Sequence, residues 1–325
     1  MKLLFYALIS CTFINFALAE ESISKNIIIL QGGNGSEIKA RKLPFNETEW
    51  SSKILTENKI DELSQIHLDY INSGAKIIMT STYAIAVPHI GRNRVIKEGK
   101  ELINRAIKAT VLAKEKSNQK DIKIAGSISP MFGSYRPDLF NEKEANKLYK
   151  ITVAPLIEND NIDILLMETI SSIQEAKFLV KFINKEMKLR NINKPYWISF
   201  TLDDNMPRLR SGEGIADIIK VLELVKSNPP QAILFNCSQP EMTTLAIKEL
   251  KKINGQFLIG AFANRFQKVK DLSATEATPL RDLSPDQHLD FTKQWVADGA
   301  EIIGGCCGVG PDYIKAVSKY FNNKQ

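Results

Sequence analysis

Residues 298–308 read Asp-Gly-Ala-Glu-Ile-Ile-Gly-Gly-Cys-Cys-Gly and combine the two patterns that organise this chain. The glycine at position 299 is typical of a helix C-terminus, and a short β-branched run follows it directly. Residues 73–78, Ser-Gly-Ala-Lys-Ile-Ile, repeat this order far away in the sequence. The repeat predicts helices that lead through a glycine into strands of one sheet.

Short β-like runs alternate with amphipathic helical stretches along the chain. Strands are predicted at residues 26–30, 76–80, 122–125, 162–167, 196–200, 232–235, 257–260 and 301–303. Helices are predicted near residues 57–73, 94–116, 142–159, 172–188, 214–227, 242–253, 285–298 and 311–321. Alternating strands and helices imply a parallel sheet, and eight such units predict an α/β fold of the closed (β/α)₈ or TIM-barrel type. A doubly wound open sheet is the alternative.

The composition is that of an ordinary globular protein. Of the 325 residues, 44% are hydrophobic and 25% are charged, with a formal net charge of +6. The basic residues lie beside acidic residues in helical stretches and form no cluster. We therefore expect no nucleic-acid partner, because nucleic-acid-binding proteins concentrate their positive charge.

Residues 1–19 resemble a secretory signal peptide. Lys2 precedes an apolar run that ends in Ala-Leu-Ala at residues 17–19. The run is too short for a stable membrane span. We therefore expect one mature domain over residues 20–325, exported to the periplasm or secreted, and a cytoplasmic protein if the leader is not functional. Cys11 lies within the leader, and its lipidation is left open.

The other three cysteines follow predicted strands. Cys237 closes the sixth run, and Cys306 and Cys307 follow the eighth run after a glycine pair. Because strand ends of a parallel barrel converge on one face, these thiols are expected to meet. Three thiolates leave one position of a tetrahedral zinc ion open, as in catalytic zinc sites. We therefore predict Zn²⁺ bound by the three cysteines with a substrate thiol in the open position. Three buried structural thiols are the alternative.

Residues that follow the other predicted strands are candidates for substrate binding. Glu168 closes an apolar run, where a buried carboxylate needs a cation, either a substrate ammonium or a structural Arg or Lys. The remaining candidates are Gln31, Gly32, Gly33, Tyr83, Asn236 and Asn264. The glycines allow close approach of the backbone to a ligand. The tyrosine would cover the site or pack, and the asparagines would bind polar groups or cap loops.

None of the three histidines ends a predicted strand. His67 lies in a helical pattern, His89 in a loop and His288 at a helix start. We therefore expect packing or surface roles for them, and a Cys–His nucleophilic enzyme is poorly supported.

Several short motifs between residues 27 and 317 occur together in one known family. They are the glycine pair with Gly35-Ser36-Glu37, His67-Leu-Asp-Tyr, Thr80-Ser-Thr-Tyr, Ala125-Gly-Ser-Ile-Ser-Pro, Met167-Glu-Thr-Ile, Ser199-Phe-Thr, Asn236-Cys and Gly304-Gly-Cys-Cys. In these motifs the chain resembles the homocysteine S-methyltransferase family, whose zinc motifs are the last two. The resemblance implies a zinc-bearing (β/α)₈ barrel that methylates homocysteine to methionine. It also implies zinc on the three cysteines and the homocysteine ammonium near Glu168.

The chain departs from that family at Gln31, where relatives usually carry aspartate. Glutamine keeps the hydrogen-bonding capacity of this position and loses the negative charge. A nucleophilic thiolate suits a small donor with a neutral leaving group, so we expect a sulfonium or quaternary ammonium donor, S-methylmethionine first and glycine betaine second. An exported, non-catalytic protein that binds zinc or thiols on this scaffold is the alternative function. The sequence does not predict the oligomeric state.

Overall fold

The computed structural model describes residues 27–225, 227–253, 255–268 and 278–322. The predicted leader at residues 1–19 therefore lies outside the described residues, as does Cys11. Within the described ranges, no helix combines the length and apolar character needed to cross a membrane.

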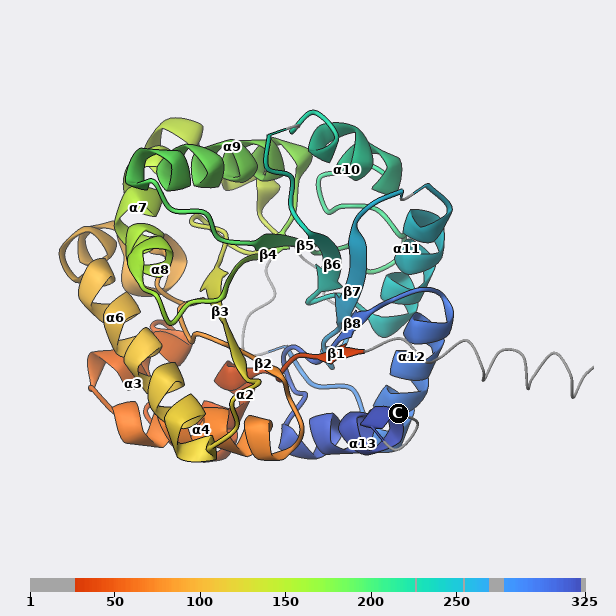
Figure 1. Cartoon of the computed structure of the whole chain (residues 1–325), viewed down its shortest axis with the longest axis horizontal. Helices are drawn as coiled ribbons and strands as arrows, with labels where there is room; N and C mark the ends of the chain where they lie inside the picture. Colours follow the sequence, from red (N-terminus) through yellow and green to blue (C-terminus); the bar gives the residue numbers. More distant parts are fainter. Residues whose placement is uncertain (1–26, 226, 254, 269–277, 323–325) are drawn as a thin grey trace, which may run out of the picture.

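Eight strands form the centre of the molecule (Figure 1). They are β1 (Ile28–Ile29), β2 (Ile77–Met79), β3 (Lys123–Ile128), β4 (Ile164–Ile170), β5 (Tyr196–Phe200), β6 (Ala232–Asn236), β7 (Leu258–Phe262) and β8 (Ile302–Ile303). Neighbouring strands are parallel in the order β1-β8-β7-β6-β5-β4-β3-β2. A parallel bridge between Leu30 and Ile77 joins β1 to β2 and closes the sheet. The predicted (β/α)₈ barrel is confirmed, and the open-sheet alternative is wrong.

Helices surround the barrel (Figure 1). They are α2 (Asn34–Ala40), η1 (Trp50–Ser52), α3 (Lys53–Thr56), α4 (Ile60–Asn72), α5 (Val87–Ile90), α6 (Arg92–Ser117), η2 (Pro137–Leu139), α7 (Glu142–Thr152), α8 (Ala154–Glu158), α9 (Ile173–Arg190), α10 (Ile215–Leu222), α11 (Pro240–Ile253), α12 (Pro285–Ala297) and α13 (Pro311–Asn322). The predicted helix at 142–159 is divided into α7 and α8 at Val153, just before Pro155. The elements α2, η1, α3, α5 and η2 were not predicted, because helices of three to seven residues are too short to show a periodic pattern.

The two glycines of the sequence repeat have the backbone conformation that the repeat predicts. Gly74 follows α4 with a φ of +99°, and Gly299 follows α12 with a φ of +109°. A left-handed residue after a helix reverses the chain toward the next strand, and glycine adopts it without a steric penalty. The repeat therefore marks two equivalent helix-to-strand connections of the barrel.

The barrel has two hydrophobic cores, and the strand period of two divides its side chains between them. Leu165 and Met167 of β4 belong to the core between the strands and the helices. Leu166 belongs to the core inside the barrel, together with Trp197 and Leu234. Cys237 and Cys306 belong to this inner core as well. The thiols thus lie at the end of a packed barrel interior, the usual place for the active site of this fold.

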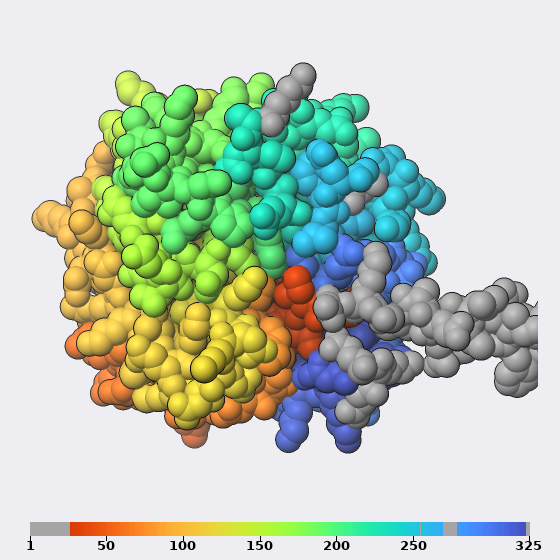
Figure 2. Space-filling view, viewed as in Figure 1, coloured from red at the N-terminus to blue at the C-terminus, as the bar shows by residue number. Residues whose placement is uncertain are grey.

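The first and last strands lie side by side. Ile28 pairs with Ile302, and Ile29 pairs with Ile303. Figure 2 shows the red N-terminal segment directly beside the blue C-terminal part of the chain. This pairing places the loop after β1 against the loop after β8, which carries two of the three cysteines.

Candidate metal and substrate site

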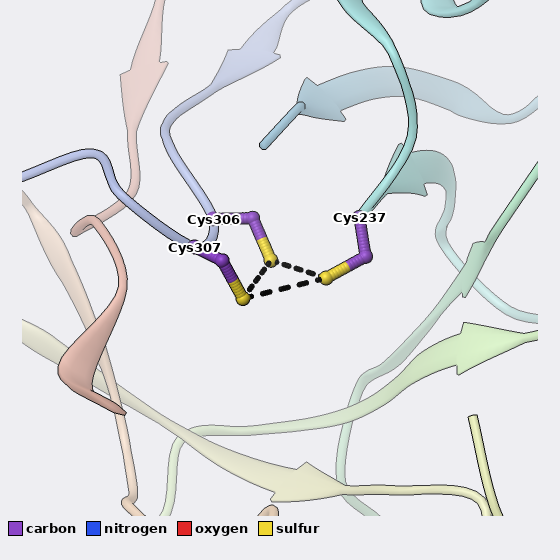
Figure 3. A group of neighbouring side chains, drawn as sticks. All are labelled: Cys237, Cys306 and Cys307. Atoms are coloured by element: carbon purple, nitrogen blue, oxygen red, sulfur yellow. Dashed lines mark hydrogen bonds between the residues drawn. The ribbon is translucent and has the colours of Figure 1, made fainter. Parts of the chain in front are cut away.

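The three cysteines of the barrel converge at the carboxyl ends of β6 and β8. The Cys237 sulfur lies 2.7 Å from that of Cys306 and 3.8 Å from that of Cys307, and the last two sulfurs are 3.9 Å apart. All three side chains point toward one centre (Figure 3). Cys237 and Cys306 are buried, and Cys307 is half-buried. Three sulfur ligands grouped in this way form a candidate metal site, and all three cysteines line a cavity that a further ligand could enter.

The three thiols differ in pKa, and Cys237 is the most acidic of them. The pKa of Cys237 is held well below its usual value, because the thiols of Cys306 and Cys307 hydrogen-bond to its sulfur. The same hydrogen bonds to Cys237 raise the pKa values of Cys306 and Cys307 well above their usual range. A bound cation would stabilise all three as thiolates, since metal binding and thiol deprotonation are coupled.

An unusual backbone conformation directs Cys237 toward the site. Its φ is 49°, in the left-handed region that non-glycine residues rarely occupy. The Cys237 carbonyl accepts hydrogen bonds from the Tyr135 hydroxyl at 3.0 Å and the Thr201 hydroxyl at 3.2 Å. The guanidinium of Arg210, which pairs with Asp204, lies 4.1 Å over the Tyr135 ring. These contacts hold the strained residue in place, as is common around functional sites.

The glycine pair after β1 makes room for the cysteine loop. A Cβ on Gly32 would lie 2.0 Å from the Val309 carbonyl oxygen, and one on Gly33 would lie 2.6 Å from that of Cys306. Both contacts involve backbone, which has little freedom to move away. The pair therefore allows two loops to pack closely. Both glycines also line the cavity beside the thiols.

Glu168 lies in the same cavity without a charged partner. Its side chain is buried, and one carboxylate oxygen accepts a hydrogen bond from the Ser127 hydroxyl. Burial raises the pKa of Glu168 to about 8, and the negative charge of Cys237 adds to this effect. No lysine, arginine or histidine among the described residues forms an ion pair with it. A buried carboxylate of this kind gains most from a ligand that brings a positive charge.

A bulge in β4 directs Glu168 toward the cavity. The register of β4 against β5 shifts between Met167 and Ile170, and Thr169 has a φ of 61°. Asn236 holds this bulge, since its Oδ1 accepts the Thr169 amide hydrogen bond at 2.8 Å and its Nδ2 donates to the Thr169 hydroxyl at 2.8 Å. The Ser199 hydroxyl also donates to Asn236 Oδ1 at 2.7 Å. Asn236 therefore positions the strand that carries Glu168.

Replacing Asn236 by alanine is expected to lower the free energy of unfolding by about 2 kcal/mol, because the buried Thr169 amide loses its acceptor. Urea unfolding measures the change. Asn264→Ala is the matched control, since the Asn264 side chain accepts one backbone hydrogen bond, from Phe266 at 3.2 Å. An equal or smaller loss for Asn236→Ala than for Asn264→Ala would show that Asn236 does not hold the bulge.

The structure places the predicted substrate-binding residues in two groups. Gln31, Gly32, Gly33, Tyr83 and Glu168 line one cavity together with the three cysteines. We call it the inner cavity. Asn236 and Asn264 are buried, and they line neither this cavity nor the second cavity described below. Their predicted substrate contact does not fit this geometry, because their side chains are occupied by Thr169, Ser199 and Phe266.

A second, larger cavity adjoins the inner one. We call it the outer cavity. Trp50, Tyr83, Cys237 and Cys307 line both. Its other aromatic lining residues are Phe132, Tyr135 and Phe266. The outer cavity thus leads to the Cys237 and Cys307 sulfurs along an aromatic wall.

Sequence reasoning identified Tyr83 but missed Trp50 and Tyr135. The Trp50 and Tyr83 rings meet edge to face at 5.4 Å. Trp50 belongs to a three-residue helix, and Tyr135 lies in the loop after β3. Neither directly follows a strand, which was the signal used to select site residues. Both have a positive φ, which the sequence does not reveal.

Comparisons with known proteins point to one family. The family model described as homocysteine S-methyltransferase matches residues 28–321. Homocysteine S-methyltransferase 1 of Arabidopsis thaliana is 26% identical, over 93% of this chain and 96% of the relative. Homocysteine S-methyltransferase of Escherichia coli is 27% identical, over 90% and 94%. Selenocysteine methyltransferase of Astragalus bisulcatus is 24% identical, over 91% and 93%.

A solved structure has the same fold. The metallated form of the Escherichia coli homocysteine methyltransferase superposes with a TM-score of 0.74 at 24% identity, covering 91% of this chain and 97% of that protein. Since the family model spans nearly all of the barrel, the chain belongs to the homocysteine S-methyltransferase family.

Proposed function

We propose that the protein transfers a methyl group from a sulfonium or betaine-type donor to homocysteine, giving methionine, with Zn²⁺ bound by Cys237, Cys306 and Cys307. The observation that carries this proposal is the convergence of three thiols beside one buried, unpaired carboxylate in a single cavity. Membership of the homocysteine S-methyltransferase family supports the reaction.

The spacing of the sulfurs supports zinc as the metal. Tetrahedral Zn–S bonds of about 2.3 Å separate neighbouring sulfurs by about 3.8 Å. The Cys307 sulfur lies 3.8 and 3.9 Å from the other two. The Cys237–Cys306 pair at 2.7 Å would widen by about 1 Å on binding. Three soft sulfur ligands also favour zinc over hard cations.

Different groups in the inner cavity bind the thiol and the ammonium of homocysteine. Zinc, when bound, supplies an open position that lowers the pKa of a coordinated thiol and keeps its sulfur nucleophilic. Glu168 faces the same cavity and meets the substrate ammonium, which satisfies its buried charge. The homocysteine thiol releases its proton to solvent on binding, so the reacting sulfur carries the electron pair for attack.

The outer cavity suits a cationic methyl donor. A sulfonium or quaternary ammonium group is attracted to aromatic faces, and Trp50, Tyr83 and Tyr135 line this cavity. The homocysteine sulfur forms a bond to the donor methyl carbon while the bond from that carbon to the donor sulfur breaks. The electron pair of the broken bond stays on the donor sulfur and cancels its positive charge. S-methylmethionine would thus give two molecules of methionine from one donor and one homocysteine.

The test is to purify the chain, measure its zinc content and assay methionine formation with S-methylmethionine and with glycine betaine. We expect about one zinc per chain and turnover with S-methylmethionine. Turnover with glycine betaine alone would correct the donor. Zinc without turnover on either donor would favour a non-catalytic zinc- or thiol-binding protein and contradict the proposed reaction.

A further inference from the structure

Four polar side chains form a closed hydrogen-bonded ring, and three of them, Gln31, Asn34 and Ser81, line the inner cavity. Gln31 Nε2 donates to Asn34 Oδ1 at 2.8 Å, and Asn34 Nδ2 donates to Ser81 Oγ at 2.8 Å. Ser81 Oγ lies 3.4 Å from His67 Nε2, and His67 Nδ1 lies 3.1 Å from Gln31 Oε1. Gln31 follows β1 and Asn34 begins α2, whereas Ser81 follows β2 and His67 lies in α4. Only the folded barrel brings these four residues together.

The backbone of Met79 fixes the direction of the ring. The Met79 amide donates to Gln31 Oε1 at 3.0 Å, and the Met79 carbonyl accepts from Asn34 Nδ2 at 3.3 Å. A backbone N–H can only donate and a carbonyl can only accept, so the oxygen and nitrogen of the Gln31 and Asn34 amides cannot exchange places. His67 Nδ1 therefore carries the hydrogen, and the Ser81 hydroxyl donates to His67 Nε2. Burial lowers the pKa of His67 to about 3, which agrees with this single-proton form.

The ring leaves Gln31 with one way to contact a ligand. Its oxygen already accepts from Met79 and His67. One hydrogen of its Nε2 goes to Asn34, and in the described part of the chain no acceptor takes the other. Gln31 lines the inner cavity. The residue is fully buried in the cavity wall, so the remaining Nε2 hydrogen is the polar group that its side chain has left for a ligand, whereas an aspartate or glutamate would offer an acceptor.

The charges around the cavity indicate which ligand group this donor meets. Among the described residues that line the inner cavity, Glu168 is the one carboxylate, and none is lysine, arginine or histidine. An amino-acid substrate brings one ammonium and one carboxylate. The ammonium is drawn to Glu168, and the carboxylate needs a donor and is repelled by Glu168. We propose that Gln31 is a specificity-determining residue that donates a hydrogen bond to the carboxylate of the amino-acid substrate, while the ring with His67, Ser81 and Asn34 keeps it from acting as an acceptor. This proposal rests on the proposed function and deepens it.

The test compares two thiols on the zinc-loaded full chain by calorimetric binding: homocysteine and 3-aminopropanethiol, which is homocysteine without its carboxylate. The Gln31→Glu variant changes the donor into a charged acceptor with little change in size. We expect its dissociation constant for homocysteine to rise about 100-fold and that for 3-aminopropanethiol to stay within about threefold of the unmodified chain. The Gln31→Met variant removes the donor without adding charge, and we expect a rise of about 10-fold for homocysteine alone.

Three results would overturn the assignment. Tighter homocysteine binding by Gln31→Glu would place residue 31 beside the ammonium. Equal losses for both thiols would mean that the variants merely damage the ring, and unchanged binding of both would remove residue 31 from the contact. If Gln31→Glu does not fold, as thermal unfolding would reveal, the Gln31→Met comparison decides. Failure of the unmodified chain to bind either thiol would overturn the proposed function and this inference together, whereas the first three results overturn the inference alone.

Discussion

Replacement of Cys306 by serine is expected to abolish metal binding and turnover together. Cys306 is buried in the inner core, and its sulfur contacts that of Cys237. A serine hydroxyl keeps a proton at neutral pH and is a much weaker zinc ligand than a thiolate. We expect zinc content to fall from about one per chain to near zero and methionine formation to fall below detection. Metal analysis of the purified variant and the methyl-transfer assay measure the two effects.

The matched control is Cys11→Ser in the full-length chain. Cys11 lies in the predicted leader, apart from the other three thiols in the sequence, so this change should leave zinc content and turnover as they were. A Cys306→Ser variant that keeps both its zinc and its activity would remove Cys306 from the site. An intact metal content without activity would instead restrict Cys306 to a role in the reaction.

Replacement of Glu168 by glutamine is expected to raise the KM for homocysteine about 100-fold, with a smaller effect on kcat. The change removes the negative charge that the buried site offers to the substrate ammonium. Removing one partner of a buried charge pair weakens binding by about 2–5 kcal/mol. Glutamine keeps the size of the side chain and can still accept the hydrogen bond from Ser127. Steady-state kinetics with saturating donor measure the change.

Glu175→Gln provides an internal comparison for this variant. Glu175 of α9 is also buried, and burial also raises its pKa to about 8. However, it lines neither cavity, so its replacement should leave the KM unchanged. Binding of 4-sulfanylbutanoate, which is homocysteine without its ammonium, should be no weaker in Glu168→Gln than in the unmodified chain. Equal kinetics for Glu168→Gln and the unmodified chain would show that the ammonium binds elsewhere.

The barrel could be predicted from the sequence because its signals are local. The run at 196–200 was predicted with the bounds of β5. The run at 232–235 ends one residue before β6 does, and the run at 76–80 extends one residue beyond β2 at each end. Each depends on β-branched and aromatic residues between turn signals. Helices of eight or more residues likewise showed their periodicity. The short α2 did not, although it begins with Asn34, a member of the ring.

The candidate site could be predicted where a functional residue directly ends a strand. This rule selected Glu168 and the three cysteines, and the structure brings them together in one cavity, because parallel strand ends meet on one face. It also selected Asn236, whose side chain turns to Thr169 instead of the cavity. It gave His67 a packing or surface role, and the structure buries His67 against Gln31, a contact that the sequence did not reveal. Contacts between residues 36 positions apart depend on how elements pack, and no local pattern carries that information.

The order of strands and helices, and the presence of three thiols and one carboxylate at strand ends, were determined by the sequence itself, since hydrophobic periodicity and residue type act over a few neighbouring positions. Tertiary structure decided where those side chains point. Positive φ angles at Trp50, Thr169 and Cys237 turn the chain at the site, and they persist because partners from distant segments hold them. Tertiary structure also decided that the side-chain oxygen of Gln31 is occupied, since Met79 and His67 reach it only once β1, β2 and α4 have come together.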